Sequence, residues 1–462
     1  VGVVVERGAI AALIDNKGLV SAEDGTVFMS ARAASSLARA VVNSSGSVEA
    51  SSATRVGGVI RLDAGNIGQV EVSGKLDASS AAGPGGQVVI TGNAIALQPG
   101  ATISATGATA GGEVLMGGDR QGQGDLLQAQ TVSVESGATI DVSATGKGDG
   151  GKAIVWSDIS QAQGSTTFNG NIQANAGPQG GDGGFVETSG AQLSVGKDAV
   201  VRTTSALGQA GTWLLDPYDV IISDSRTLAG AAYGDQYTAN ADTSVIRASS
   251  IVAALDSGSN VTITTGAAGS AGSQSGNIDV ESSIIKTSGA AATLTLTAAN
   301  QIQVNAGVTI GSTGDALHLD LNASGTTGSR KFEGVFSGTG SLTKSGAGTV
   351  VLSGANTYTG GTILAGGTLT PDHMQALGSA GTISFTGGTL QNGASNGSDY
   401  SGRFSTAANQ LYSIDTSLIS WVVFFNPLTS VGGTLTKLGS GLLSLIGNNT
   451  YTGTTTISAG RL

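Results

Sequence analysis

Three aspartates stand close together in the sequence, at Asp216, Asp219 and Asp224. Carboxylates gathered on one face could act as general acid and base on a polysaccharide, or could hold Ca²⁺. Turn formation also explains them, because Pro217 follows Asp216 and Asp caps turns through its own side chain. We favour the turn, and we interpret the preceding Trp213 as a core side chain rather than a platform for a sugar.

The two histidines, His318 and His373, are the other candidates for acid–base or metal chemistry. His318 alternates with leucines in the run LHLDL, which places it on the opposite face, and His373 follows the turn at Pro371. Neither has a partner at the spacing of a metal motif such as HExxH, and no Ser-His-Asp set can be nominated. We predict that both are surface histidines.

Two sets of short phrases suggest a ligand more weakly. The Gly-Asp-Gly phrases at 148–150 and 181–183 are similar to calcium-binding nonapeptides, but those need tandem repetition every nine residues, which this sequence lacks. The Thr-x-Thr runs at 262–264 and 293–295 do not recur at one period, so ordinary strand threonines are favoured over an ice-binding ladder.

A phrase that occurs twice, NTYTG, contains an asparagine and a tyrosine in each copy. We predict that Asn356 and Asn449 occupy left-handed turns, and that Tyr358 and Tyr451 cover a corner of the fold. A ligand role for the tyrosines is the alternative. Taken together, the candidates lead us to predict no catalytic residue, no cofactor and no metal site.

The composition argues against several classes of protein. The 462 residues carry a net charge of -11 and show no cluster of Lys and Arg, which argues against nucleic-acid binding. There is no cysteine, so disulfides and thiolate metal sites are excluded. No transmembrane segment is predicted: a spanning helix needs roughly 18 apolar residues, and the longest candidate, 418–428, is too short. The 75 glycines among Val, Ile, Thr and Leu indicate many short strands separated by turns.

Internal repeats organise these strands. A glycine-pair phrase returns at 57, 85, 111, 150 and 183, at intervals typical of solenoids. Each unit contains three short apolar runs, which corresponds to one turn of a triangular coil. We predict an all-β chain folded as a right-handed parallel β-helix (β-solenoid), with roughly triangular coils in a single elongated rod.

The glycine pairs also fix which side chains point inward. Because strand side chains alternate, we predict that Val88, Val114, Ala153 and Val186 form one inward column, that Ile90, Met116, Val155 and Thr188 form another, and that Gln87, Glu113, Lys152 and Phe185 point outward. An outward apolar stripe remains, formed by Val89, Leu115 and Ile154. We predict that the insert 119–130 leaves the coil and that its Leu126 and Leu127 cover this stripe.

The C-terminal part carries a closer repeat. Residues 340–369 match residues 433–462 without a gap at an offset of 93 residues, with about half of the positions identical; four turns of about 23 residues would account for this offset. We divide the chain into residues 1–218 (first repeat type), 219–330 (less regular coils, with a short helical bulge at 249–258) and 331–462 (second repeat type). Neither end has the atypical sequence of a capping repeat, so we expect the rod to continue in the native molecule.

These phrases carry a family resemblance. GGEVLMGGDRQGQG, GATIDVSATGKGDGGKAIVWSD, GGDGGFVETSG and GTWLLDPYDVIIS resemble the repeat region of filamentous haemagglutinin-type exoproteins, the large adhesins of two-partner secretion. The LTK…GANTYTGGT units resemble autotransporter-associated β-strand repeats. The resemblance covers most of 57–224 and 340–462. Neither an amino-terminal secretion domain nor a carboxy-terminal barrel signature is visible, so the choice between the two routes stays open.

The resemblance implies a structural shaft segment of a large secreted adhesin, not an enzyme, located on the bacterial surface. Its partners would be an outer-membrane transporter during secretion, then host or cell-surface glycans or proteins, or other copies of itself, with attachment or biofilm matrix as the outcome. A self-assembling matrix filament is the alternative. A carbohydrate-active β-helix enzyme is the third reading, and convergence of three acidic side chains in one groove would favour it.

Overall fold

The computed structural model describes residues 2–9, 13–23, 25–33, 41–53, 57–161, 163–226, 243–266, 275–326 and 330–462. The chain divides into two compact units, Val1–Gln274 and Ser275–Leu462, which are described separately. Their boundary falls inside the block 219–330, and the three-block division stays a prediction. Among the described residues, no helix combines the length and apolar character needed to cross a membrane.

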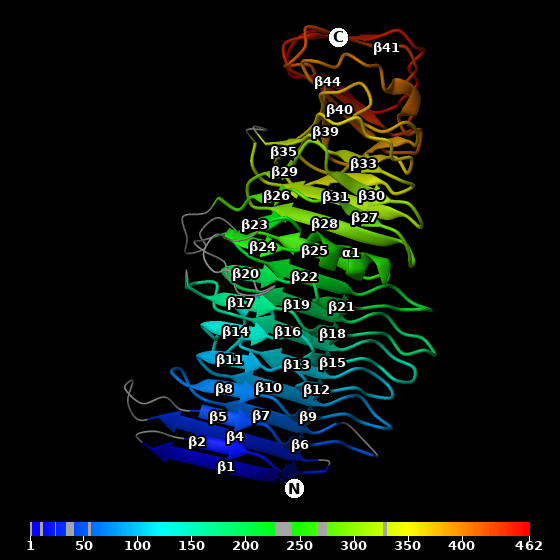
Figure 1. Cartoon of the computed structure of the whole chain (residues 1–462). Helices are drawn as coiled ribbons and strands as arrows, with labels where there is room; N and C mark the ends of the chain where they lie inside the picture. The colour runs from blue at the N-terminus through cyan, green and yellow to red at the C-terminus, as the bar shows by residue number, and fades with distance from the viewer. Residues whose placement is uncertain are drawn as a thin grey trace. The chain divides into compact units, whose positions relative to one another are not determined.

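Unit 1 is built from three parallel sheets, and a typical coil contributes one strand to each of them (Figure 1). The last coil differs, because it contributes both β23 and β24 to the second sheet and a helix in place of a strand of the third sheet. The strands of sheet A are β1 (Gly2–Ala9), β4 (Thr26–Ala33), β7 (Val59–Asp63), β10 (Gln87–Thr91), β13 (Glu113–Met116), β16 (Lys152–Trp156), β19 (Phe185–Ser189), β22 (Thr212–Asp216) and β25 (Asn260–Thr264). The strands of sheet B are β2 (Leu13–Asn16), β5 (Val41–Ser44), β8 (Gln69–Val72), β11 (Ala94–Leu97), β14 (Thr131–Val134), β17 (Ser165–Phe168), β20 (Gln192–Val195), β24 (Thr243–Ile246) and β23 (Asp219–Ile222). The strands of sheet C are β3 (Leu19–Ser21), β6 (Ser47–Glu49), β9 (Lys75–Asp77), β12 (Thr102–Ser104), β15 (Thr139–Asp141), β18 (Asn171–Gln173) and β21 (Val200–Arg202).

The predicted inward columns are confirmed. Val88, Val114, Ala153 and Val186 are register partners on successive strands of sheet A and are fully buried. The column continues into Trp213, which is also fully buried, and whose Nε1 donates to Thr188 Oγ1 at 3.0 Å. The second column, with Ile90, Met116, Val155 and Thr188, is buried as well. The prediction that Trp213 is a core side chain is therefore confirmed.

The predicted helical bulge is α1 (Ala248–Asp256), which buries Ile251, Ala254 and Leu255. Gly258 follows it with a φ of 90°, a conformation that a residue without a Cβ adopts freely. Arg247 is the N-cap residue of this helix. Ser249 donates to Asp224 Oδ1 from both its backbone N–H and its hydroxyl.

Unit 2 starts with three strands per coil and continues with two. Sheet D contains β28 (Ala292–Ala298), β31 (Leu317–Ala323), β34 (Leu342–Ser345), β36 (Thr362–Leu364) and β38 (Ile383–Phe385). Sheet E contains β26 (Ile278–Val280), β29 (Ile302–Val304), β32 (Lys331–Phe332), β35 (Thr349–Leu352), β37 (Thr368–Pro371), β39 (Thr389–Gln391), β40 (Leu411–Asp415), β42 (Thr434–Leu438) and β44 (Thr455–Ile457). The shorter sheets are F, with β27 (Ile284–Lys286), β30 (Thr309–Ser312) and β33 (Val335–Ser337), and G, with β41 (Trp421–Phe424) and β43 (Leu442–Leu445). Short 3-10 turns lie at η1 (Arg120–Gly122) in unit 1 and η2 (Ser401–Arg403) in unit 2.

The 93-residue offset is not a whole number of coils, so the four-turn interpretation is wrong. Lys344 lies on β34 of sheet D, whereas its sequence equivalent Lys437 lies on β42 of sheet E. The ladder of sheet E reaches Lys437 from Val350 in four steps, through Leu369, Leu390 and Ile414. The first copy therefore begins on β34 of sheet D, one strand before β35 of the sheet E ladder. The second copy begins on β42, which is itself a strand of that ladder.

The predicted parallel β-helix is confirmed, because the strands among the described residues pair in parallel and stack one coil on the next, apart from β23 and β24, which pair within one coil.

Candidate functional site on the outer face of sheet A

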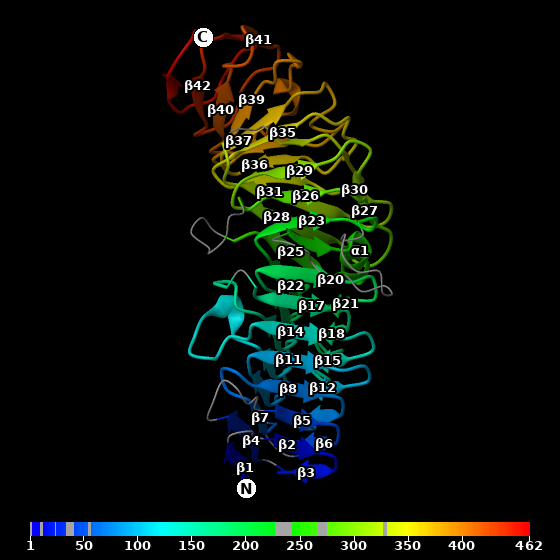
Figure 2. The same cartoon turned by 60° about the vertical axis from the view of Figure 1, so that its left-hand side comes forward.

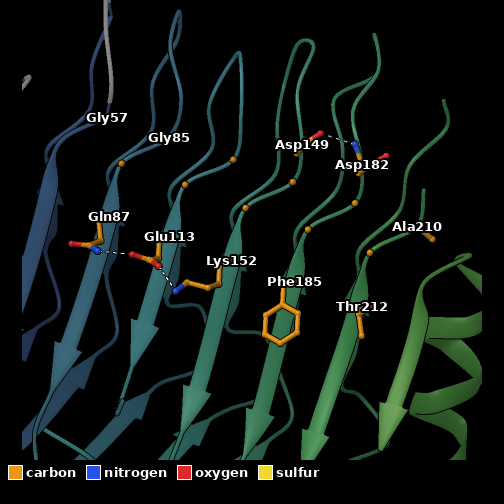
Figure 3. A pocket seen from close by; sticks show the side chains of 18 of the residues that line it. Gly57, Gly85, Gln87, Glu113, Asp149, Lys152, Asp182, Phe185, Ala210 and Thr212 are labelled. Atoms are coloured by element: carbon orange, nitrogen blue, oxygen red, sulfur yellow. Dashed lines mark hydrogen bonds and ion pairs between the residues drawn. The ribbon is translucent and has the colours of Figure 1, made fainter. Parts of the chain in front are cut away.

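A groove follows the corner where the glycine pairs precede sheet A (Figure 3). Its volume is about 910 Å³, and we call it the corner groove. Its lining includes the glycine pairs together with Gln87, Glu113, Lys152, Asp149, Asp182 and Phe185. A Cβ on Gly85 would lie 2.0 Å from Ala105 O, so the close stacking of coils is enough to explain this glycine. The Gly85 N–H donates to Ala110 O at 3.0 Å and is not available to a ligand.

Polar side chains along the corner groove are bonded to one another across coils. Gln87 Nε2 donates to Glu113 Oε2 at 2.5 Å, and Lys152 Nζ lies 2.5 Å from Glu113 Oε1. These are the residues predicted to point outward, and their placement is confirmed (Figure 3). Because Gln87, Glu113 and Lys152 bond to one another across neighbouring strands, they stabilise the surface of the coils.

The aspartates of the Gly-Asp-Gly phrases serve the backbone of the following coil. Asp149 Oδ1 accepts from Asp182 N at 2.8 Å, and Asp182 Oδ1 accepts from Gln209 N at 2.8 Å. Across the described ranges, no group of three His, Asp or Glu side chains could hold a metal ion. The structure therefore gives these two residues a turn-capping role.

The three aspartates around Pro217 have separate environments. Asp224 accepts hydrogen bonds from Ser249 at the start of α1, Asp219 begins β23, and Asp216 ends β22. Burial raises the pKa of Asp216 to about 7. The charge of Asp216 acts on Glu187, a residue that our sequence analysis did not single out.

Glu187 is fully buried although it points to the outer face of sheet A. Its carboxylate accepts from the N–H of Gln121, 3.2 Å from each oxygen, and from Ser189 Oγ at 3.0 Å. Burial, and to a lesser extent the charge of Asp216, raises the pKa of Glu187 to about 7 against the opposing effect of these hydrogen bonds. A signal was present in the sequence: Glu187 occupies the stripe position that is Val89, Leu115 and Ile154 in other coils.

The insert 119–130, which we call the strap, leaves the coil and folds back over this face (Figure 2, cyan segment beside the strands). Val89, Leu115, Ile154 and Trp156 form a buried cluster under it, with Leu126, Ile159 and Phe185 packed against them. The predicted covering role is confirmed for Leu126. Leu127 instead lines a separate pocket.

Specific contacts hold the strap in place. Trp156 Nε1 donates to Gln128 Oε1 at 3.0 Å, and the Arg120 guanidinium lies 4.4 Å from the centre of the Phe185 ring. Lys152 Nζ contacts Asp119 Oδ1 at 3.2 Å. Gln121 has a φ of 52°, which an L-residue adopts at a cost, and this conformation aims its N–H at Glu187.

The histidines lie in ordinary environments. His318 is outward on β31, and its Nδ1 is 2.8 Å from Ser341 Oγ of the next coil. His373 Nδ1 accepts from Gln375 N at 3.1 Å within a turn. Both residues are partly exposed, which agrees with the predicted surface histidines.

The asparagines of NTYTG are not in left-handed turns, and this prediction is wrong. Among the described residues, only Gln121 and Asn409 combine a side chain with a positive φ. Asn356 instead bridges three coils: its Oδ1 accepts from Phe336 N at 2.7 Å and its Nδ2 donates to Ala376 O at 2.6 Å. Asn449 accepts from Leu428 N in the same way.

The tyrosines of NTYTG are anchored to the threonine four residues later. The Tyr358 hydroxyl lies 2.6 Å from Thr362 Oγ1, and Tyr451 makes the equivalent bond with Thr455 at 2.5 Å. Tyr358 is fully buried and is therefore a core residue.

A lysine anchors each copy of the C-terminal repeat. Lys344 is fully buried, and its Nζ donates to the carbonyls of Ser345 and Gly346 in its own turn and of Gly366 in the next coil. Lys437 repeats this arrangement with Leu438, Gly439 and Ala459. The ammonium thus joins two successive coils.

Both copies match a known repeat family. Residues 342–370 and 435–462 match the passenger-associated-transport-repeat. A comparison with curated proteins found no match. The predicted autotransporter-associated repeats are therefore confirmed, and unit 2 carries two repeats of the kind named for transported passengers. The haemagglutinin-type resemblance of the N-terminal part stays a prediction.

Proposed function

We propose that this chain is a shaft segment of a secreted bacterial surface adhesin, which carries an attachment or matrix function away from the cell. The observation that supports it best is the pair of passenger-associated-transport-repeats at 342–370 and 435–462, each of which contributes strands to the parallel ladder of sheet E. A parallel ladder has no natural end and can be extended by further coils, which suits a shaft.

The contacts of unit 1 also support a structural role. The corner groove carries ion pairs and backbone caps that are already satisfied, and the acidic side chains of Asp216, Asp219 and Asp224 do not form one catalytic group. In this proposal an outer-membrane transporter moves the chain out, by either route, and host or cell-surface glycans or proteins are the final partners.

Surface location is tested on intact cells that express the natural full-length protein. Protease added outside should degrade this region while a periplasmic marker stays whole. Protection of the region until the outer membrane is opened would contradict the proposal.

The matrix filament is the second candidate, and it predicts a different solution behaviour. Light scattering of the purified chain should rise with time and concentration if copies associate into filaments. Beads coated with the chain should bind cells without such a rise if the chain acts in attachment.

The enzyme alternative is tested on Glu187 and Asp216, two acidic residues whose pKa values are raised to about 7. Release of sugar from an extracellular polysaccharide, lost in Glu187→Gln, would favour an enzyme. We expect no release by either protein, since the strap covers Glu187.

A further inference from the structure

A pocket of about 540 Å³ lies on the outer face of sheet A, beside the strap. Its size is within the range of about 300 to 1,000 Å³ that is usual for small-molecule sites. One wall comes from the coil of β7 and the loop after it, and the other wall comes from Asp125, Leu126 and Leu127 of the strap. We call it the strap pocket.

Arg61 is the only basic residue that lines the strap pocket. It belongs to the outward stripe of sheet A, and its register partners are Phe28 on β4 and Val89 on β10. Its side chain is exposed, and among the described residues it forms no hydrogen bond or ion pair. The guanidinium therefore lies between apolar neighbours in an acidic protein, with its five donors available.

The two acidic residues of the strap pocket differ in their availability. Asp63 is 8% exposed, and its carboxylate accepts from Thr91 Oγ1 at 3.1 Å and from Gly65 N at 2.9 Å. The Asp63 carboxylate is therefore already hydrogen-bonded within the protein. Asp125 on the strap is exposed, and within the described part of the chain it has no bonded partner; its oxygens can accept hydrogen bonds from hydroxyl groups.

We propose that the strap pocket binds the carboxylate-bearing ring of an acidic sugar, of the uronic or sialic acid type. The planar guanidinium of Arg61 matches a carboxylate with two parallel hydrogen bonds. The ring hydroxyls donate to Asp125, and the apolar face of the ring packs on Phe28 and Leu127. One ligand thus accounts for the unpaired cation, the unpaired carboxylate and the apolar walls. This rests on the proposed function, which names glycans among the partners, and adds a class of glycan and a site for it, whereas the shaft role itself needs no pocket.

The test is a calorimetric titration of the whole chain with methyl glucuronide, and with methyl glucoside as the neutral sugar of the same shape. We expect saturable binding of the glucuronide, and binding of the glucoside weaker by at least about tenfold, the loss expected for a charge-assisted pair. The affinity of Arg61→Gln for the glucuronide should be lower by a similar factor. Arg61→Lys should bind with intermediate affinity, because it keeps the charge but not the planar fork.

Arg202→Gln is the matched control, since Arg202 is an exposed arginine on sheet C outside the strap pocket. It should bind the glucuronide as the unchanged chain does. Equal affinity for glucuronide and glucoside would overturn the proposal, as would full binding by a folded Arg61→Gln chain. Absence of saturable glucuronide binding up to its solubility limit would also overturn it, and would leave the shaft role untouched.

Discussion

Buried lysines donate hydrogen bonds to the glycine turns of unit 2. Lys286, Lys344 and Lys437 are fully buried, yet each ammonium group reaches backbone carbonyls of a glycine turn. Burial lowers the pKa of Lys344 to about 8, so its side chain is still mostly charged at neutral pH. An ammonium has three donors, and in Lys344 and Lys437 three carbonyls receive them.

Replacing the Lys344 side chain by one of similar length should show what the ammonium contributes. Lys344→Met leaves three turn carbonyls without their donor, so we expect a loss of about 1–3 kcal/mol in the free energy of unfolding. Hydrogen exchange should accelerate at the turns around Gly346 and Gly366, and urea unfolding gives the energy.

Lys331→Met is the control for that experiment. Lys331 is 40% exposed and pairs with Asp372 at 3.2 Å, and such pairs contribute at most about 1 kcal/mol. Equal losses in the two variants would contradict the anchoring role of Lys344.

At the scale of the element, Glu187 makes the stability of the strap depend on pH. Glu187 has its ordinary pKa near 4.5 in the unfolded chain and about 7 in the folded one. Between these values the folded state holds more protons than the unfolded state, so its stability decreases as pH rises. The strap is therefore held most firmly below this window and loses that stabilisation as pH rises through about 7.

Trypsin cleavage after Arg120 should report this opening locally. In mildly alkaline buffer we expect the unchanged chain to be cut several-fold faster than Glu187→Gln, which mimics the protonated acid and still accepts from the Gln121 N–H. In slightly acidic buffer the two chains should be cut at similar rates. A rate ratio that does not change with pH would show that Glu187 does not control the strap.

Removing the strap should expose the apolar cluster beneath it. The neighbouring coil turns the same corner with only Gly92 and Asn93, so residues 118–130 can be replaced by Gly-Asn. We expect a clear rise in the fluorescence of an apolar dye, because Val89, Leu115, Ile154 and Trp156 lose their cover. Adding Leu115→Thr and Ile154→Thr should reverse the rise, and no rise in the shortened chain would refute the covering role.

The elements differ in how far the sequence alone could predict them. The inward columns of sheet A were predictable because the glycine pairs mark the phase of the strands that follow them, and a shift of one residue would expose the whole set. The position of Lys437 on sheet E was not predictable, because the irregular segment between β39 and β42 determines on which strand the second copy begins. The burial of Glu187 depends on Gln121, which is 66 residues earlier in the chain, and no local pattern reveals it.

At the scale of the whole molecule, the absence of cysteine fits the secretion across the outer membrane that we propose. A chain that crosses the outer membrane unfolded must not contain loops closed by covalent bonds. An oxidising compartment forms disulfides between cysteines wherever geometry allows them. Ser133 and Thr167 face each other on β14 and β17, at the spacing of about 4.8 Å between neighbouring strands. This spacing suits a disulfide.

We therefore expect the double variant Ser133→Cys with Thr167→Cys to reach the cell surface in several-fold lower amounts than either single variant. The measurement is the amount of protein on intact cells that express the natural full-length protein with its transporter. Each single variant controls for the substitution itself, because one thiol cannot close the loop. Reductant in the growth medium should restore the double variant, since the block comes from the covalent loop and not from altered packing. Surface display of the oxidised double variant at the level of the single variants would show that this part of the chain does not cross in an extended form.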